Sequence, residues 1–277
     1  MNERHILRRV RGMDTADGAG VKLKRIIGQP GLDMLDPFLL LDEFRSESAD
    51  DYLAGFPEHP HRGFETVTYM LAGHMRHADN QGHRGDLVPG SVQWMTAGRG
   101  IVHSEMPQQE NGLMWGFQLW VNLPAKDKLT APRYQDISPE RIPLLHPAEG
   151  VTLKLIAGEL DGVSGPVTAV ATAPLYLDIA LQPGAAFELS LPAGHHAFAY
   201  VFDGESAQVA GETLRRSELA VLSEGERLRV AGGAAPARLL VVAGQPLREP
   251  VARYGPVVMN TPEQIHEAIA DLRAGRF

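Results

Sequence analysis

The chain has 277 residues, a formal net charge of −8 and no cysteine. This length accommodates two domains of ordinary size, and an acidic surface disfavours binding to the phosphate backbone of nucleic acids. The absence of cysteine excludes disulfides, thiolate metal sites and cysteine nucleophiles.

The first residues do not resemble a targeting segment. Residues 1–12 contain four arginines with no apolar run behind them, which is not the pattern of a secretory signal. No stretch of the sequence has the length of apolar residues needed to span a bilayer. We therefore expect a soluble, cytoplasmic protein that has no contact with a membrane.

The first half of the chain is predicted to be made of short strands. Short apolar runs alternate with turns rich in Gly and Pro, as in a sandwich or barrel. Between residues 113 and 121, apolar side chains occupy every second position, which indicates a strand with one apolar face. The other strands expected in this half cover residues 21–27, 37–44, 64–71, 74–78 and 91–96.

The second half repeats this pattern after an irregular connection. Residues 123–147 contain several prolines and charges without periodicity, so we expect them to cross between two halves. Near the end, Thr261 with Pro262 and Gln264 forms a helix start with a capping box. The strands expected in this half cover residues 151–157, 174–181, 197–202, 218–222 and 238–242.

Two short motifs carry the residues best suited to chemistry. His59 and His61 are two positions apart, and so are His103 and Glu105. On a strand, side chains two positions apart point to the same face. If the two strands lie together, three imidazoles and one carboxylate converge, which suits a borderline transition metal such as iron and does not suit calcium or magnesium.

A second carboxylate competes with Glu105 for the metal. Glu65 shares the parity of His59 and His61, so an uninterrupted strand would bring it to the same face. Parity alone leaves Glu65 and Glu105 both open as the fourth ligand. If Glu65 is not a ligand, it becomes a candidate partner for Arg62 or for a ligating imidazole.

The remaining histidines are predicted to have no part in the site. His74, His77 and His83 lie in or near a polar turn, and we expect them to be solvated. His195 and His196 are adjacent, so on a strand they point to opposite faces and cannot chelate as a pair. The second half is therefore expected to bind no metal.

Five segments resemble the pirin family of cupins over nearly the whole chain, thinly between residues 160 and 245. They are residues 59–66 (HPHRGFET), 93–107 (QWMTAGRGIVHSEMP), 122–128 (NLPAKDK), 259–262 (MNTP) and 273–277 (RAGRF). The resemblance implies an all-β bicupin, two face-to-face antiparallel jelly-roll barrels with a short C-terminal helix. It divides the chain into a metal-binding barrel at 1–125, a connection at 126–150, and a metal-free barrel with the helix at 151–277.

The resemblance also implies a ligand set and an activity. It favours His59, His61, His103 and Glu105 as ligands of one divalent ion per chain, most simply Fe(II), with Glu105 also acting as the catalytic base. The implied reaction is quercetin 2,3-dioxygenase-like cleavage of a flavonol by dioxygen. The alternative is a non-catalytic, redox-sensitive iron protein acting through a protein partner. Further candidates to surround the metal or line its pocket are Glu65, Arg99, Trp94, Met106 and Phe56.

Overall fold

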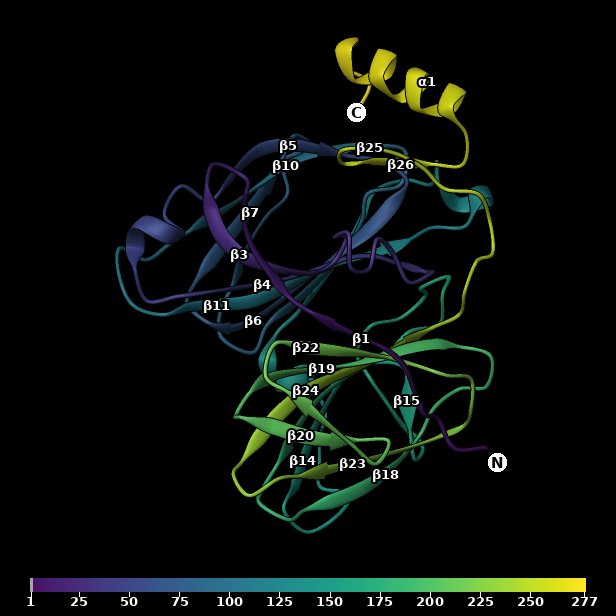
Figure 1. Cartoon of the computed structure of the whole chain (residues 1–277). Helices are drawn as coiled ribbons and strands as arrows, with labels where there is room; N and C mark the ends of the chain where they lie inside the picture. Colours follow the sequence, from purple (N-terminus) through teal and green to yellow (C-terminus); the bar gives the residue numbers. More distant parts are fainter. Residues whose placement is uncertain (1) are drawn as a thin grey trace. The chain divides into compact units, whose positions relative to one another are not determined.

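The computed structural model describes residues 2–277, and strands dominate it (Figure 1). Its contacts divide the chain into two compact units. The N-domain comprises Met13–Gln29, Phe38–Pro139 and Leu247–Phe277, and the C-domain comprises Met1–Gly12, Pro30–Pro37 and Glu140–Pro246. No helix in the described part of the chain combines the length and the apolar character of a membrane span.

The N-domain is a sandwich of two antiparallel sheets. The larger sheet has the order β12-β9-β6-β11-β4-β3-β2, and the smaller one has the order β5-β10-β7-β8. The larger sheet contains β2 (Met13–Asp17), β3 (Val21–Ile27), β4 (Phe38–Ser46), β6 (Phe64–Ala72), β9 (Val92–Thr96), β11 (Met114–Asn122) and β12 (Arg133–Ile137). The smaller sheet contains β5 (Phe56–His61), β7 (Met75–Asp79), β8 (Arg84–Leu87) and β10 (Ile101–Pro107).

The C-domain repeats the same strand order. Its sheets run β1-β22-β19-β24-β17-β14-β13 and β18-β23-β20-β21. The larger contains β1 (Ile6–Arg11), β13 (Leu144–Leu145), β14 (Val151–Ala157), β17 (Leu175–Leu181), β19 (His196–Asp203), β22 (Glu218–Leu222) and β24 (Ala237–Gly244). The smaller contains β18 (Ala186–Ser190), β20 (Ser206–Val209), β21 (Glu212–Arg215) and β23 (Arg227–Gly232), and β15 (Glu159–Leu160) pairs with β16 (Val163–Ser164). The expected duplication of a jelly-roll unit is confirmed, with open sheets in place of closed barrels.

The ends of the chain lie in the domains opposite to those expected from their position in the sequence. Strand β1 pairs with β22, so residues 6–11 form the edge of the C-domain sheet. Strands β25 (Ala252–Tyr254) and β26 (Val257–Met259) and helix α1 (Pro262–Arg273) belong to the N-domain. Strand order accounts for the first of these placements, because β1 occupies in one domain the edge position that β12 occupies in the other.

The connection expected at 126–150 contains a strand. Residues 133–137 form β12, which pairs with β9 along its length. Arg133, Gln135 and Asp136 are polar, and the strand forms an edge of its sheet, so it lacks the apolar alternation by which the other strands were predicted.

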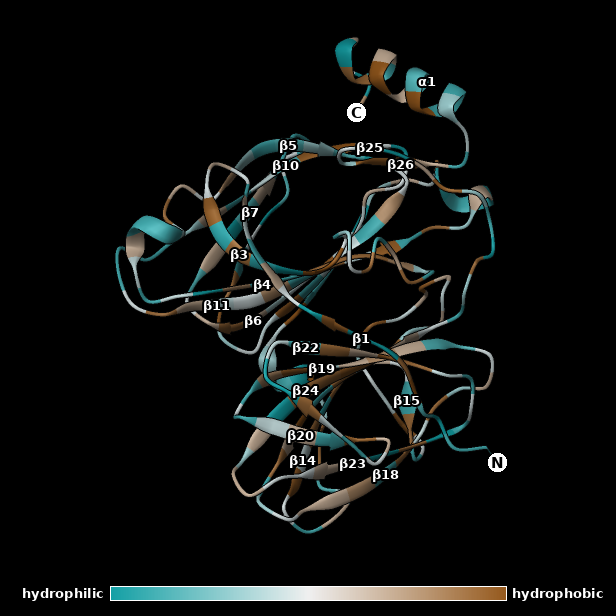
Figure 2. Cartoon of the chain, viewed as in Figure 1, coloured by the Kyte–Doolittle hydropathy of each residue, from teal (hydrophilic) through white to brown (hydrophobic). Residues whose placement is uncertain are grey.

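Helix α1 forms as its sequence predicts. The side chain of Thr261 accepts a hydrogen bond from Gln264 N, and the Gln264 side chain accepts one from Thr261 N, which completes the capping box. The α1 ribbon alternates between apolar and polar residues (Figure 2). Its buried side, Ile265 and Ala268, packs in a small apolar cluster with Val257 and Met259 of β26.

A buried lysine ties the C-terminal segment to the sheet that carries it. Lys128 is 1% exposed and donates hydrogen bonds to the carbonyl oxygens of Gly63 (2.8 Å) and Val258 (3.0 Å) and to Asn122 Oδ1 (2.7 Å). Burial lowers the pKa of Lys128 to about 8, so at neutral pH the ammonium keeps the three protons that its three acceptors need.

Lys128→Met should lower the free energy of unfolding of the N-domain by about 2–4 kcal/mol, because three buried acceptors lose their donor. Tryptophan fluorescence can follow this unfolding, since Trp94, Trp115 and Trp120 are the three tryptophans of the chain and all lie in the N-domain. Lys126→Met, two residues away and exposed, is the control and should leave the transition unchanged. Equal transitions for the two variants would contradict the role given to Lys128.

Candidate metal centre

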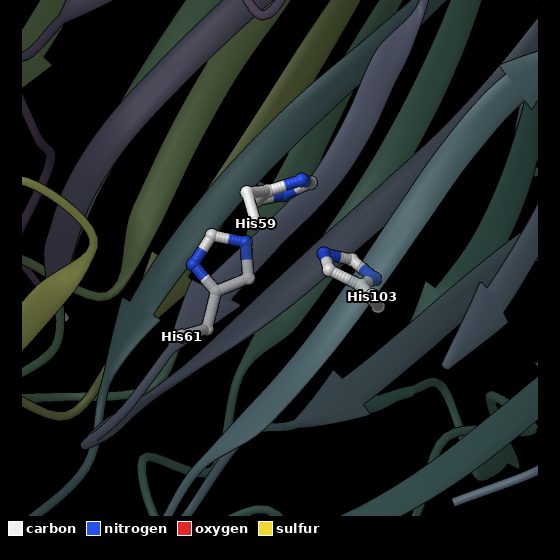
Figure 3. A group of neighbouring side chains, drawn as sticks. All are labelled: His59, His61 and His103. Carbon is white, nitrogen blue, oxygen red and sulfur yellow. The ribbon is translucent and has the colours of Figure 1, made fainter. Parts of the chain in front are cut away.

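Strands β5 and β10 bring three histidines together. The strands are antiparallel, with His59 opposite His103 and His61 opposite Ile101. The centres of the three imidazole rings are 4.5–4.9 Å apart, and one nitrogen from each ring lies within 4.8 Å of the others. Figure 3 shows the three rings turned toward a common point.

The ring nitrogens need a partner that the described residues do not supply. Both nitrogens of His103 are buried and make no hydrogen bond to residues 2–277, and those of His61 are buried without a hydrogen bond of full geometry, although the Pro256 backbone lies close enough to raise the His61 pKa slightly. In His59, Nδ1–H donates to the Pro57 carbonyl oxygen at 2.8 Å, which leaves the Nε2 lone pair available. Buried polar atoms without partners are rare, so this cluster fits a transition metal ion.

The electrostatics of the site favour neutral imidazoles. Burial, followed by the neighbouring imidazoles, lowers the pKa of His61 and of His103 well below the usual value. Both rings are therefore uncharged at neutral pH, which is the form that ligates metals.

Glu105 lies on the same strand as His103 and lines a cavity together with His59 and His61. A bulge between the two residues places Glu105 opposite Phe56. Its buried carboxylate is held by polar neighbours: Thr68 Oγ1 lies 2.9 Å from Glu105 Oε1, and Gln118 Nε2 donates to Oε2 at 3.5 Å. Among residues 2–277, the group whose possible ligand atoms all lie within 4.8 Å of one another contains the three histidines but not Glu105.

Glu65 lies apart from the three histidines. Glu65 would share the face of His61 only on one continuous strand from His61 to Glu65. The chain instead leaves β5 after His61, Gly63 adopts φ 86°, and β6 begins at Phe64. The carboxylate accepts a hydrogen bond from Thr96 Oγ1 at 2.6 Å, and burial raises its pKa. The premise of an uninterrupted strand, which kept Glu65 open as a ligand, is therefore wrong.

A cavity of about 540 Å³ opens beside the histidines. Part of its lining is apolar and aromatic, and its polar lining residues include Glu105, Thr68 and Gln118. Cavities of this volume accommodate a drug-sized ligand. The apolar and aromatic lining residues are Leu23, Leu40, Phe44, Phe56, Met75 and Trp120.

A partly buried ion pair also lines the cavity. Arg25 donates to Asp42 through Nε (2.9 Å) and Nη2 (2.7 Å), and Nη2 also contacts Asp17 Oδ2 at 2.7 Å. Asp42 is 4% exposed, and its burial raises its pKa to about 6 against the opposing effect of Arg25. The cavity thus offers charged hydrogen-bonding groups in addition to those beside the histidines.

Only some of the pocket residues expected from the sequence line the cavity. Phe56 lines it. Trp94 is buried, Met106 is half-buried and Arg99 is exposed, and none of them is among the described lining residues. Gln118 and Trp120 were missed, although both occupy the second face of the strictly alternating 113–121 segment, which is the signal that could have found them.

His77 is buried, which contradicts the expectation that it is solvated. It lies on β7, is 1% exposed and stacks on Tyr134 with ring centres 5.3 Å apart. Its Nε2 is 3.7 Å from Asp136 Oδ1. The polar turn misled the prediction, because a short strand can bury one residue inside an otherwise polar segment. His74 is half-buried and His83 is exposed.

The corresponding strands of the C-domain carry apolar side chains. Strands β18 and β23 occupy the positions of β5 and β10 in the repeated order. Leu189, Leu228 and Val230 on these strands are fully buried in the C-domain core. Aliphatic groups offer no ligand atoms, so among the described residues the cluster of three histidines belongs to the N-domain alone.

Metal binding should stabilise the N-domain. A divalent transition metal at 100 times its Kd is expected to add about 2.7 kcal/mol to the free energy of unfolding, measured by tryptophan fluorescence. His61→Ala should abolish this increase. His74→Ala should retain it, because His74 does not belong to the three-histidine group and bonds Asp86 instead. An equal increase in both variants would place the metal elsewhere.

Comparison with known proteins gives consistent matches over the whole chain. A family model described as Pirin matches residues 20–121, and one described as Pirin C-terminal cupin domain matches residues 176–277. A Pseudomonas aeruginosa protein, provisionally named a quercetin 2,3-dioxygenase, is 51% identical over 279 residues, covering 98% of this chain and 97% of its own. Human pirin is 44% identical over 266 residues, covering 94% and 89%.

The fold is also found in solved structures. The crystal structure of a quercetin 2,3-dioxygenase from Acinetobacter baumannii superposes with a TM-score of 0.91 and 35% identity, and the match covers 100% of this chain and 99% of that one. The similarity therefore extends over both domains.

Proposed function

Because the chain belongs to the pirin family, we propose that it is a metal-dependent dioxygenase that opens the heterocycle of a flavonol such as quercetin and releases carbon monoxide. The observation that carries this proposal is the convergence of three imidazoles, of which those of His61 and His103 are buried and neutral, beside a cavity of about 540 Å³. The similarity to a solved quercetin 2,3-dioxygenase supports the choice of substrate class.

The ion is held, in this proposal, by His59, His61, His103 and Glu105, and Fe(II) is our choice among the metals that this donor set suits. A bound ion would polarise the 3-hydroxyl and 4-carbonyl of the flavonol and lower the pKa of the hydroxyl. To join the three imidazoles, the Glu105 carboxylate must reorient from the contacts that it makes with Thr68 and Gln118.

Glu105 is suited to remove the proton of the substrate hydroxyl. It is a carboxylate that lines the cavity together with His59 and His61. Thr68 Oγ1 lies between Glu105 Oε1 (2.9 Å) and Gln118 Oε1 (2.6 Å), so its single proton can orient either group. The aromatic rings of Phe44, Phe56 and Trp120 provide flat apolar surface for the flavonol rings.

The overall reaction is balanced without an external reductant. Dioxygen adds to C2 and C4 of the flavonol, the C2–C3 and C3–C4 bonds break, and C3 leaves as carbon monoxide. Both atoms of dioxygen remain in the ring-opened ester. The residues of the cavity therefore have to bind one aromatic substrate, accept one proton and return it to the product.

The test is to load the protein with Fe(II) anaerobically, add quercetin and air, and measure carbon monoxide released per chain. We expect many equivalents from the wild-type protein and none from His59→Ala. Flavonol-dependent oxygen uptake that survives removal of metal would refute the proposal. No release from a wild type that holds stoichiometric iron would favour the alternative, a redox-sensitive regulatory protein that acts through a partner.

A further inference from the structure

The C-terminal segment, defined here as residues 252–277, helps to build the cavity of the N-domain. Strands β25 and β26 form a hairpin whose turn brings Gly255 and Pro256, together with Arg253, to the cavity wall. The hairpin adjoins the end of β5 through a bridge between Arg62 and Val257 (Figure 1). The C-terminal segment thus contributes to the cavity that His59 and His61 also line.

Strand β5 needs an anchor because it lies at the edge of its sheet and pairs only with β10. Arg62, the residue after His61, supplies it through the backbone. Arg62 N donates to the Pro256 carbonyl oxygen at 3.3 Å, and Val258 N donates to the Arg62 carbonyl oxygen at 3.0 Å. The backbone next to one histidine is therefore held by the hairpin.

The side chain of Arg62 continues this attachment. It is 5% exposed, donates to Asp271 Oδ2 of α1 at 2.8 Å and places its guanidinium 4.2 Å from the ring centre of Phe277. An ion pair and a cation–π contact at one buried guanidinium fix its position more firmly than an exposed pair would. The helix and the last residue of the segment thereby reach the histidine strand.

Phe277 also contacts the second histidine strand. Its ring lies against Gly100, directly before β10, so closely that a β-carbon on residue 100 would be 2.7 Å from the ring. Its carbonyl oxygen accepts a hydrogen bond from Asn80 Nδ2 at 2.9 Å. Asn80 in turn bonds Val102, the neighbour of His103, through N to the Val102 carbonyl (2.9 Å) and through Oδ1 from Val102 N (3.3 Å).

We propose that Arg62, Asp271 and Phe277 are positioning residues for the metal centre. Through them the C-terminal segment holds β5 and β10 at the spacing at which the three imidazoles share one ion. Metal ligands must be held within a fraction of an ångström, and groups that orient ligands change affinity when they are lost. The inference rests on the metal site of the proposed function and adds to it a dependence on the far end of the chain.

The experiment measures Co(II) affinity and the visible spectrum of the Co(II) form in full-length variants. Asp271→Ala and Phe277→Ala should each weaken binding about 10-fold and change the ligand-field bands. Phe277→Tyr keeps a ring over Arg62 and should bind as the wild type does. Glu267→Ala removes an exposed carboxylate from the same helix and is the control, with no expected effect.

Hydrogen exchange provides a readout that does not depend on the metal. In Asp271→Ala and Phe277→Ala, the amides of His59, His61 and residues 101–103 should exchange faster than in the wild type and in Glu267→Ala. Unchanged affinity and unchanged exchange would overturn the inference. If the wild type binds no Co(II), the proposed function fails, and the exchange rates alone decide whether the segment holds the two strands.

Discussion

Glu105→Gln should reduce the rate of flavonol cleavage by about 100- to 10,000-fold, the usual contribution of a general base. Glutamine has the shape of glutamate and retains an acceptor for Thr68, so the cavity around it should persist. An amide cannot accept the proton of the substrate hydroxyl and is a weaker ligand than a carboxylate. Carbon monoxide release per bound iron measures the effect, with iron content determined separately so that weaker binding is not mistaken for lost chemistry.

The matched control for this prediction is Glu65→Gln. Glu65 is also a buried carboxylate, but its hydrogen bond comes from Thr96, and it does not line the described cavity. Its substitution should leave the rate within about twofold, since no substrate contact is lost. Loss of activity in Glu65→Gln with retention in Glu105→Gln would reverse the assignment of the carboxylate.

Gly63→Ala should lower the free energy of unfolding of the N-domain by about 3–5 kcal/mol. Gly63 has φ 86°, a conformation that residues with a β-carbon rarely adopt. A β-carbon there would also lie 1.9 Å from the Val258 carbonyl oxygen, which is backbone and also accepts from Lys128. The alanine variant must therefore push the β25–β26 hairpin away from the end of β5.

Gly112→Ala separates the two causes of this loss. Gly112 has φ 90°, nearly that of Gly63, but a β-carbon there would meet nothing within 4 Å. It should cost only the backbone strain, about 1 kcal/mol. The midpoint of tryptophan fluorescence during denaturation compares the two variants. Similar losses would show that the close approach of Val258 does not matter to stability.

Much of the fold could be predicted from local patterns. Residues 151–157 and 218–222 form strands with the predicted bounds, and the capping box of Thr261 starts α1 as expected. These elements depend on neighbours in the sequence, since alternation sets the faces of a strand and a cap satisfies the first turn of a helix. The polar edge strand β12 shows the limit of this approach, because it has no alternation to detect.

The candidate site likewise combines features set by local sequence with features set by distant contacts. Two-residue spacing within β5 and within β10 is a local property, and it suffices to place His59 beside His61 on one face. The relation of Glu65 to the histidines depends on whether the chain stays extended across Gly63. That turn is stabilised by Val258 and Lys128, both distant in sequence, so parity within one segment could not reveal it.

The sequence by itself determined the repeated β unit, the paired histidines and the capped C-terminal helix, because each is encoded by spacing within a few residues. Only the tertiary structure decided which domain receives each end of the chain, how the Arg25–Asp42 pair reaches the cavity, and that His77 is buried. These features depend on strand pairing and packing between residues far apart in the chain. Such contacts are selected by the burial and hydrogen bonding of the whole domain, for which no local pattern exists.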